Sequence, residues 1–570
     1  MLTRDFAATF NSTPTWPDRA SSNHASAAFW LACIALLLFL PGFFTLPPMD
    51  RDEPRFAQAS KQMLETGDYV AIRFQDEARN KKPVGIYWLQ AGAVALGEVL
   101  GVDEARGKIW LYRVPSLLGA MSAVLLTYWA ALPFVSRRNA FIAAALLAAT
   151  VLLGVEARLA KTDAVVTATV VAAMGALARA WLFRAVSWRN ALIFWLAIGV
   201  GILVKGPITP MIPAFAALAL AVSARSGRWL LVLRPLAGLA LCALIVAPWL
   251  ILIGLKTHGA FFTEAIGGDM LGKVAGAKEA HGAPPLTYLA VFWATAWPMA
   301  PLAALAAPFA WRKRHAPKML FLLAWLLPAW LLFELVPTKL PHYVLPLYPA
   351  IAIAVALALQ EGALHLQQSW RKIVLLLVPG LAVALVLAVM IASLVFHTAL
   401  DWRFGGMALA VMLVAYALIQ SIMARKIHRV LVLLPTLAFS LAITAYSTVL
   451  TTAAFHSFAL SPRLAEARRV AMAGAPNCAT LASATTGYRE PSLVFLTGTD
   501  LAMTSGAGAA AFLDAAPCRL AFVDAAQEPA FLAALKAPLQ VKATARIAGI
   551  NLNGGKTLDI GVWVRQDMAP

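Results

Sequence analysis

Acidic and basic side chains gather in short segments that separate long apolar stretches of this chain. The first of these segments, Asp52-Glu53-Pro54-Arg55, directly follows an apolar stretch. One interpretation is a solvated turn that opens a helix, since Asp, Glu and Pro all favour a first helical turn. The other is a carboxylate held beside a substrate, with Asp52 accepting the proton of an attacking hydroxyl group. The residues of this segment alone leave both interpretations open.

Cations recur in four further segments between apolar stretches. A structural interpretation is anchoring at the membrane surface, because Lys extends its ammonium to the headgroups and Tyr favours that level. A functional interpretation is phosphate binding, because positioned cations neutralise the charge that builds on a departing phosphate. Gathered on one face with two carboxylates, they would suit a phosphate-linked lipid donor. The residues concerned are Lys82, Arg158 with Asp163, Lys205, and Lys339 with His342 and Tyr343.

The composition identifies the class of protein that must position these residues. Of the 570 residues, 61% are apolar and 13% are charged, and the mean hydropathy is +0.74. A soluble domain carries about 25% charged residues, so an ordinary cytosolic enzyme, a disordered chain and a collagen-like fibre are excluded. The net charge of +19 fits the Lys/Arg excess of cytoplasmic loops and its attraction to membrane lipids. Nucleic-acid binding is not expected.

Basic clusters in short loops set the orientation of a polytopic bundle. If residues 83–101 crossed the membrane, every later cluster would lie outside, against the positive-inside rule; if they lie on the surface, every cluster lies inside. The chain is therefore predicted to be mainly α-helical, with a cytoplasmic N-terminus and an extracytoplasmic C-terminus. The thirteen predicted spans are 28–46, 112–134, 139–157, 164–183, 191–206, 208–224, 236–254, 286–310, 319–336, 343–360, 373–396, 406–423 and 430–453.

Three regions follow from this topology: a cytoplasmic tail at 1–27, the membrane domain at 28–453 and a soluble extracytoplasmic domain at 454–570. Residues 48–111 form one long outer loop, in which Ala57–Leu64 and Ile86–Leu100 are apolar enough for interfacial helices.

The soluble domain is expected to be a small α/β unit. Ser461 is placed to cap its first helix, and Cys478 and Cys518 form either a disulfide or two buried thiols. Its predicted elements are helices at Pro462–Ala473 and Ala530–Leu535, with strands at Ala479–Ala482, Leu493–Leu496, Leu520–Val523, Val541–Ile547 and Thr557–Arg565, the last two joined by a turn at Gly554-Gly555.

Several motifs resemble glycosyltransferase family 39, which covers protein O-mannosyltransferases and the bacterial ArnT-like lipid A aminoarabinose transferases. The resemblance runs from residue 28 to about 350 and is stronger toward the ArnT-like branch. The motifs are Asp52-Glu53-Pro54-Arg55-Phe56, Gly67-Asp68-Tyr69, Lys82-Pro83, Tyr87-Trp88, Arg113-Val114-Pro115-Ser116, Ala157-Arg158 with Asp163, Lys205-Gly206-Pro207, and Lys339 with Pro341, Tyr343, Pro346 and Pro349.

The resemblance implies a GT-C fold and inverting transfer of one sugar from an undecaprenyl-phosphate donor. By motif, the catalytic carboxylates would be Asp52, with Glu53 beside it, and Asp163. The residues implied to bind the donor or its phosphate are Arg55, Lys82, Arg158, Lys205, Lys339, His342 and Tyr343.

The acceptor is less closely defined, because Val84 follows Pro83 where the aminoarabinose enzymes usually have a second proline. Lipid A or lipopolysaccharide is the expected acceptor, in a bacterial inner membrane with the active site on the periplasmic side. A protein O-mannosyltransferase-like enzyme is the alternative. A lipid-linked-sugar flippase is a third hypothesis, disfavoured because the charges gather at one surface and the two halves of the chain do not match.

A metal site is a separate question that the sequence leaves open. His258, Glu264, Asp269 and His281 lie between the seventh and eighth predicted spans. A His and acid pair there could hold a divalent metal, and ordinary loop polarity explains the same residues. No cofactor is certain.

Overall fold

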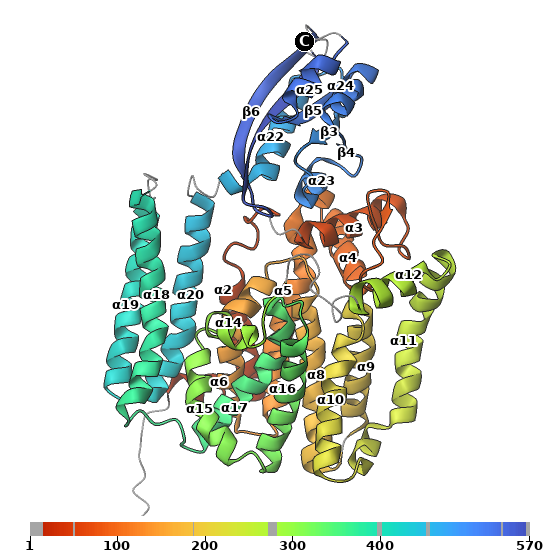
Figure 1. Ribbon diagram of the computed structural model, residues 1–570. Coiled ribbons are helices and arrows are strands. Elements are labelled where there is room, and N and C mark those ends of the chain that lie inside the picture. The colour runs from red at the N-terminus through yellow and green to blue at the C-terminus, as the bar shows by residue number, and fades with distance from the viewer. Residues whose placement is uncertain are drawn as a thin grey trace, which may run out of the picture.

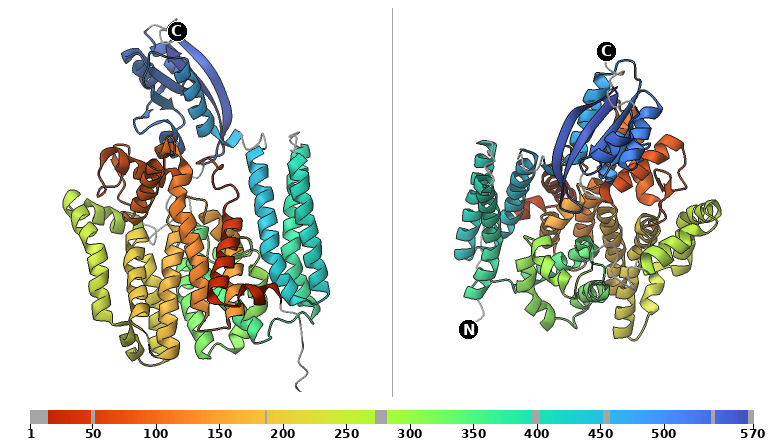
Figure 2. Two further views of the ribbon diagram at one scale, coloured as in Figure 1. Left: turned by 180° about the vertical axis from the view of Figure 1, so that it is seen from behind. Right: turned by 45° about the horizontal axis from the view of Figure 1, so that its top comes forward.

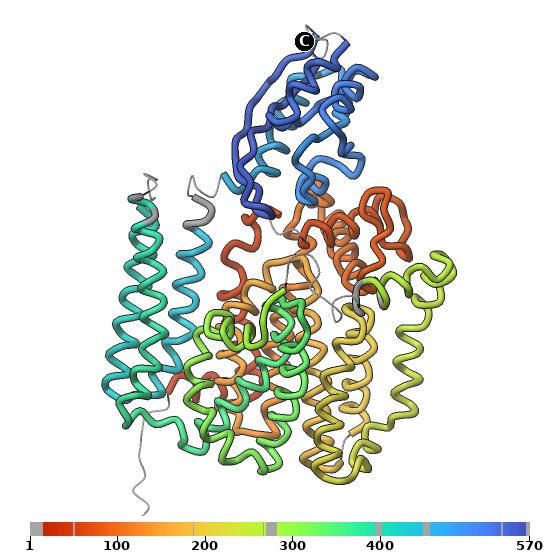
Figure 3. The backbone as a smooth tube through the Cα atoms, viewed as in Figure 1, coloured from red at the N-terminus to blue at the C-terminus, as the bar shows by residue number. Residues whose placement is uncertain are grey.

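The computed structural model describes residues 15–48, 52–185, 187–271, 282–395, 402–451, 457–536 and 540–565. These residues form a bundle of long helices and a smaller domain with a five-stranded sheet, which sits at one end of the bundle (Figure 1). The tube in Figure 3 shows the blue C-terminal part of the chain resting on the orange first loop, and the views in Figure 2 agree. The expected mainly helical membrane fold with a small α/β domain is confirmed.

The bundle consists of helices that overlap all thirteen predicted apolar segments, three of which are each built from two consecutive helices. Nine helices among the described residues are long and apolar enough to cross a membrane, and α2 and α10 are shorter apolar helices. The count of thirteen spans therefore remains a prediction. The helices are α1 (Trp16–Ala20), α2 (His24–Phe39), α5 (Ile109–Ala131), α6 (Arg137–Ala148), α7 (Val151–Glu156), α8 (Asp163–Phe183), α9 (Trp188–Lys205), α10 (Ile208–Ser223), η2 (Arg228–Leu233), α11 (Pro235–Lys256), α12 (Ala260–Phe262), η3 (Thr263–Leu271), α14 (Thr287–Thr295), α15 (Ala300–Arg312), α16 (Pro317–Leu335), η4 (Pro341–Leu347), α17 (Tyr348–Gln360), α18 (Ser369–Val395), α19 (Trp402–Met423) and α20 (Ile427–Thr451).

The long outer loop folds onto one end of the bundle. The expected helical segments Ala57–Leu64 and Ile86–Leu100 coincide with α3 (Asp52–Thr66) and α4 (Gly85–Val99), and their place at the membrane surface remains a prediction. They are joined by a buried hydrogen bond of 2.7 Å from the Ser60 hydroxyl to Gln90 Oε1. The loop also contains strands β1 (Arg73–Phe74) and β2 (Glu77–Ala78), which pair antiparallel, and the short η1 (Ala105–Gly107).

Alternating side chains give the C-terminal sheet two buried faces. Leu520 and Phe522 pack in one apolar cluster with α22 and α23, whereas Ala521 and Val523 pack in another with α24 and α25. The strand order is β4-β3-β5-β7-β6, with β4, β3 and β5 parallel and the last two pairings antiparallel. The elements are α22 (Leu460–Ala473), β3 (Ala482–Thr486), α23 (Pro491–Thr497), β4 (Ala502–Met503), α24 (Gly506–Ala515), β5 (Arg519–Asp524), α25 (Glu528–Ala534), β6 (Val541–Asn551) and β7 (Lys556–Arg565).

Most predicted elements of this domain are confirmed, but three details are wrong. The apolar run Leu493–Leu496 is helical, within α23, because Pro491 opens a helix and a short buried apolar run fits either structure. The first strand begins only at Ala482. Ser461 does not cap α22; its hydroxyl instead hydrogen bonds with Tyr488 (2.8 Å) and Ser492 (2.7 Å).

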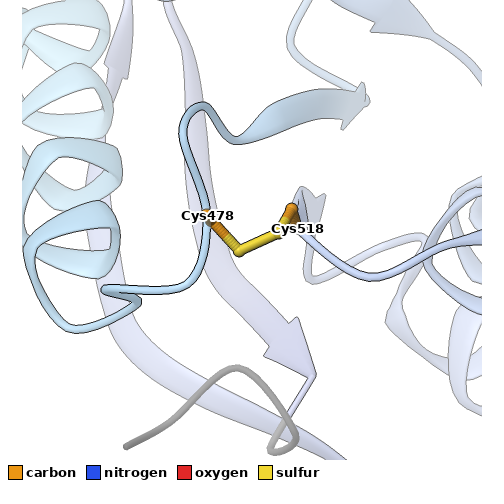
Figure 4. Close-up of a disulfide and its surroundings, with 2 residues drawn as sticks. All are labelled: Cys478 and Cys518. Atoms are coloured by element: carbon orange, nitrogen blue, oxygen red, sulfur yellow. A yellow bond between two sulfur atoms is a disulfide. The ribbon is translucent and has the colours of Figure 1, made fainter.

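The two cysteines of the domain are joined in a disulfide (Figure 4), which was one of the two expected outcomes. The bond connects the segment before β3 to the residue before β5, across a sequence separation of 40. It therefore links two neighbouring strands at the same edge of the sheet.

The disulfide should stabilise this domain mainly by constraining its unfolded state. We expect replacement of both Cys478 and Cys518 by Ser to lower the free energy of unfolding by about 2–4 kcal/mol. Thermal unfolding of the full-length protein, with and without reductant, measures this. Reductant should lower the transition of the unaltered protein and of a Cys33→Ser control, whose free thiol lies in α2, but not that of the double variant. A transition insensitive to reductant in all three would contradict the expectation.

Candidate active site

A buried ion pair fixes the start of α3, where the expected catalytic carboxylate lies. Arg113, from α5, donates to both carboxylate oxygens of Glu53, at 2.6 Å from Nε and 2.9 Å from Nη2. Both side chains are 1% exposed. Asp52 is the first residue of α3 and precedes Glu53 directly, so the ion pair sets the position of the Asp52 backbone.

Further hydrogen bonds of this pair connect three segments of the chain. The guanidinium of Arg113 also donates to the carbonyl oxygens of Phe43 (3.1 Å), Leu46 (2.7 Å) and Pro47 (3.3 Å), at the end of the first predicted span. Glu53 Oε1 accepts the backbone N–H of Ala160 at 3.0 Å. The first outer loop, α5 and the loop between α7 and α8 therefore meet at one buried point.

A second charged cluster is built from the α7–α8 loop and its neighbours. Lys205, the last residue of α9, donates to Asp163, the first residue of α8. His342 lies with Nε2 3.9 Å from Asp163 and Nδ1 3.6 Å from Glu156, and Lys161 Nζ is 3.9 Å from Glu156. The structure therefore brings together three of the predicted site residues, Asp163, Lys205 and His342.

Tyr343 and the Lys82 segment lie next to this cluster. The Lys205 ammonium is 5.4 Å from the centroid of the Tyr343 ring. Gly206 has φ +69°, and a Cβ on it would lie 3.9 Å from Pro83 Cγ. Lys82 precedes Pro83, so its segment passes beside the end of α9, and the predicted association of these motifs is found in the structure.

The two clusters share the α7–α8 loop. Besides the Glu53 contact, this loop is held by Gln90, which donates to the Ala160 carbonyl (3.1 Å), and by Ser116, which donates to the Lys161 carbonyl (3.0 Å). The hydrogen bond from the Ala160 N–H to Glu53 therefore connects the two clusters, because Glu53 follows Asp52 and Ala160 precedes Lys161.

Around Asp52 lie further charged and aromatic groups. Arg55 Nη1 is 4.0 Å from Asp52. Arg79 donates to the Tyr87 hydroxyl at 3.3 Å, and its guanidinium lies 5.1 Å from the centroid of the Phe56 ring. Burial raises the pKa of Tyr87, and the Asp52 carboxylate raises it further while Arg79 opposes both. Tyr87 therefore remains a neutral donor close to Asp52.

Two predicted phosphate-binding cations have other partners. Arg158 is 3% exposed, donates to the backbone carbonyls of Pro41, Gly154 and Leu38, and lies 4.3 Å from the centroid of the Tyr446 ring. Lys339 is 8% exposed and donates to the carbonyls of Ala283 (2.9 Å) and Val336 (2.8 Å). Both cations therefore hydrogen bond to backbone carbonyls, and their role in phosphate binding remains a prediction.

The described residues also contain a group that has the donor types of a metal site. Single ligand atoms of Glu156, Asp163 and His342 lie within 4.8 Å of one another. Lys161 and Lys205 already pair with the two carboxylates, so a cation would have to displace an ammonium. Of the residues first considered for a metal, His258 and Glu264 are exposed, while the Asp269 side chain and His281 lie outside the described residues.

Sequence reasoning missed two members of these clusters as site residues. Arg113 belongs to one of the family motifs without an assigned role, and Glu156 belongs to none of them. Both are charged residues at the ends of apolar helices, and such residues are costly to bury without a partner. That cost was the available signal, but the sequence does not say that Arg113 pairs with Glu53, sixty positions earlier.

Comparison with known proteins tests the family. Residues 81–252 match the model of the dolichyl-phosphate-mannose-protein mannosyltransferase family. The undecaprenyl phosphate-alpha-4-amino-4-deoxy-L-arabinose arabinosyl transferase of Erwinia tasmaniensis is 32% identical over 317 residues, which are 54% of each chain. That of Pectobacterium atrosepticum is 29% identical over 369 residues, 61% of this chain and 63% of the relative. The resemblance to glycosyltransferase family 39 is confirmed.

The aligned region spans between about half and two thirds of these family-39 relatives. The fold agrees over a longer stretch. The crystal structure of ArnT from Cupriavidus metallidurans in the apo state matches with a TM-score of 0.72 at 18% identity, over 96% of this chain and 99% of that chain. The structure of the same protein bound to undecaprenyl phosphate gives 0.69 at 18%, over 94% and 97%. The chain is thus a multi-pass membrane protein with the ArnT fold.

Removing the buried carboxylate should destabilise the protein far more than removing an exposed one. Glu53→Gln leaves Arg113 buried without its counter-charge, and we expect a loss of about 3–5 kcal/mol in the free energy of unfolding. Glu98→Gln is the matched control in the same loop. Its partner Arg106 also lies at 2.6 Å, but the two side chains are 37% and 42% exposed, so we expect less than about 1 kcal/mol.

Denaturant unfolding of both full-length variants in detergent measures the two effects. Equal losses for Glu53→Gln and Glu98→Gln would contradict a special role for the buried pair.

Proposed function

We propose that this chain is an inverting membrane glycosyltransferase that moves a single sugar from an undecaprenyl-phosphate donor to an envelope acceptor. The observation that carries the proposal is the meeting of the first outer loop, the α7–α8 loop, the end of α9 and the His342 segment at one end of the bundle. The names of the relatives support the donor class.

The proposed chemistry uses Asp52 and the nearby cations in separate roles. An acceptor oxygen attacks the anomeric carbon, the bond from that carbon to the donor phosphate oxygen breaks, and the configuration inverts. Arg55 and Lys82 stabilise the charge left on the polyprenyl phosphate. Asp52 accepts the proton of a hydroxyl acceptor; with an acceptor phosphate, which is already ionised, it only orients the attacking oxygen.

The Asp163–Lys205–His342 cluster lies next to the proposed phosphate site and positions the end of α9 there. Lys205 is 8% exposed and pairs with Asp163, so the pair holds the end of α9 beside Tyr343 and the Lys82 segment. We propose that the carrier phosphate lies there, next to Lys82.

We place this end of the bundle on the periplasmic side of the inner membrane. The basic loops support that orientation, since Arg138 pairs with Asp18 (2.7 Å) and with His428 (2.9 Å). These contacts gather the N-terminal segment and two basic loops at the end opposite the sheet domain in Figure 1. Positive loops favour the cytoplasm, so the sheet domain and the charged clusters would face the periplasm.

Lipid A is the acceptor that we favour. The relatives named as aminoarabinose arabinosyl transferases support it, together with the motifs that resemble the ArnT-like lipid A branch of family 39. A protein acceptor is the second candidate, favoured by the mannosyltransferase family model over residues 81–252.

Transfer to lipid A should depend on Asp52. We expect lipid A from the native host to lose one sugar unit when the gene is deleted and equally when it encodes Asp52→Asn. Transfer to a lipid A hydroxyl would lose its general base, which is worth about 10²–10⁴ in rate, and transfer to a lipid A phosphate would lose the group that orients the attacking oxygen. Intact-mass analysis of lipid A from the three strains measures this. Asp18→Asn at the opposite end of the bundle is the matched control and should leave the sugar in place. Unchanged lipid A in every strain would reject this acceptor, and the same comparison on secreted proteins would test the second candidate.

The charge balance of the second cluster predicts that transfer needs no added metal. Lys161 and Lys205 neutralise Glu156 and Asp163 directly, so a chelator should leave the turnover of the purified protein unchanged. A loss of transfer in chelator that Mg²⁺, Mn²⁺ or Zn²⁺ restores would contradict this.

A further inference from the structure

The parallel strands of the C-terminal domain end at a topological switch point. The chain passes from β3 to β4 on one side and then to β5 on the other side of β3. The segment after β3 leads to α23 and the segment after β5 leads to α25, which pack on opposite faces of the sheet. In open α/β sheets, ligands bind at such a point, outside the carboxyl ends of the strands.

The two segments meet at this edge. Gly487, which follows β3, has φ +75°, and a Cβ there would lie 2.6 Å from the Cβ of Asp524, the last residue of β5. A side chain at position 487 would therefore clash with Asp524. Only glycine combines this approach with a positive φ.

The carboxyl edge of the sheet faces the membrane domain. Asp524 pairs with Ile560, whereas Leu520, at the other end of β5, pairs with Val564. The carboxyl end of β5 is therefore the end nearer to the β6–β7 turn. Residues of that turn and Pro48, four positions before Asp52, line one small open pocket. Figure 1 likewise shows the lower end of β6 beside the beginning of the first outer loop.

Polar groups held in fixed positions line this pocket. Glu490 accepts from the side-chain amides of Asn551 (3.0 Å) and Asn553 (2.5 Å), and Asn551 Oδ1 accepts the Asn553 backbone N–H (3.0 Å). Behind them, Ser461, Tyr488 and Ser492 form a hydrogen-bonded group. The lining residues are Pro48, Phe458, Ala459, Ser461, Pro462, Tyr488, Glu490, Ser492, Asn551, Leu552 and Asn553.

The chemistry of this lining fits hydroxyl groups rather than phosphate. A carboxylate offers about four lone-pair sites, of which the two amides use two, so Glu490 can still accept from hydroxyl donors. Its negative charge repels an anion. The basic groups near Asp52, by contrast, suit a phosphate. The two regions therefore differ in the part of a glycolipid that each would bind.

We propose that this pocket at the carboxyl edge of the C-terminal sheet, centred on Glu490 with Asn551 and Asn553, binds hydroxyl groups of the acceptor's sugar rings. The acceptor glycolipid would then lie between the sheet domain and the first outer loop, with its reacting oxygen toward Asp52. This inference rests on the proposed function, because it assigns the acceptor to a second part of the same site.

The test compares acceptor binding and acceptor kinetics in three variants of the full-length protein in lipid nanodiscs. Glu490→Gln and Asn553→Ala alter the pocket, and Glu466→Gln on the exposed face of α22 is the matched control for the charge change. Binding of purified lipid A is measured without donor, and initial rates are measured with the undecaprenyl-phosphate sugar.

Both pocket variants should weaken lipid A binding and raise its KM about tenfold, the effect of losing one or two hydrogen bonds to a charged group. The kcat at saturating lipid A, the KM for donor and the melting temperature should stay near those of the control. Asn553 is exposed at the tip of the turn, so Asn553→Ala keeps the test valid even if Glu490→Gln impairs folding.

Unchanged lipid A binding in Asn553→Ala and Glu490→Gln would overturn the inference, as would a fall in kcat without any change in the KM for lipid A. If the unaltered protein binds lipid A and the pocket variants do not, but no sugar is transferred, the proposed reaction fails while the pocket stands.

Discussion

The buried ion pair between Glu53 and Arg113 is the constraint on which the arrangement of this site depends. Removing two charges from water costs several kcal/mol for each ion, so such a pair persists only if further hydrogen bonds satisfy both groups. Here three backbone carbonyls complete the partners of Arg113, and the Ala160 N–H contributes to those of Glu53. The start of α3 can therefore take few other positions, and Asp52 is held with it.

The same helix is also held from the side of the C-terminal domain. Gln58, on α3, donates to the Thr499 hydroxyl at 2.7 Å, and Lys61 donates to the Phe495 carbonyl at 3.3 Å. Gln75, in the same outer loop, donates to the Leu501 carbonyl at 2.8 Å. Helix α3 thus lies between the membrane bundle and the sheet domain, and each part of the protein limits its movement. An acceptor bound between the two parts would meet a site that is already assembled.

Sequence reasoning recovered the fold class, because apolar length, basic loops and ordered motifs are local signals. It could not recover the partners of individual cations. Arg158 and Lys339 looked alike as positive residues in outer segments, yet both donate to backbone carbonyls, whereas Lys205 pairs with Asp163. Which partner a cation takes depends on carbonyls exposed at the ends of other helices. The apolar run within α23 was assigned as a strand for a similar reason, since burial on both sides removes the periodicity that separates strand from helix.

A double-mutant cycle on the transfer rate tests most directly whether the Glu53–Arg113 pair positions Asp52. The cycle joins Glu53→Gln, Arg113→Gln and the double variant, measured at saturating donor and acceptor. If the two side chains act as one anchor, the double variant should lose little more activity than either single variant, with a coupling energy of about 1–3 kcal/mol. Losses that simply add would contradict the account, because Glu53 and Arg113 would then act on the reaction independently.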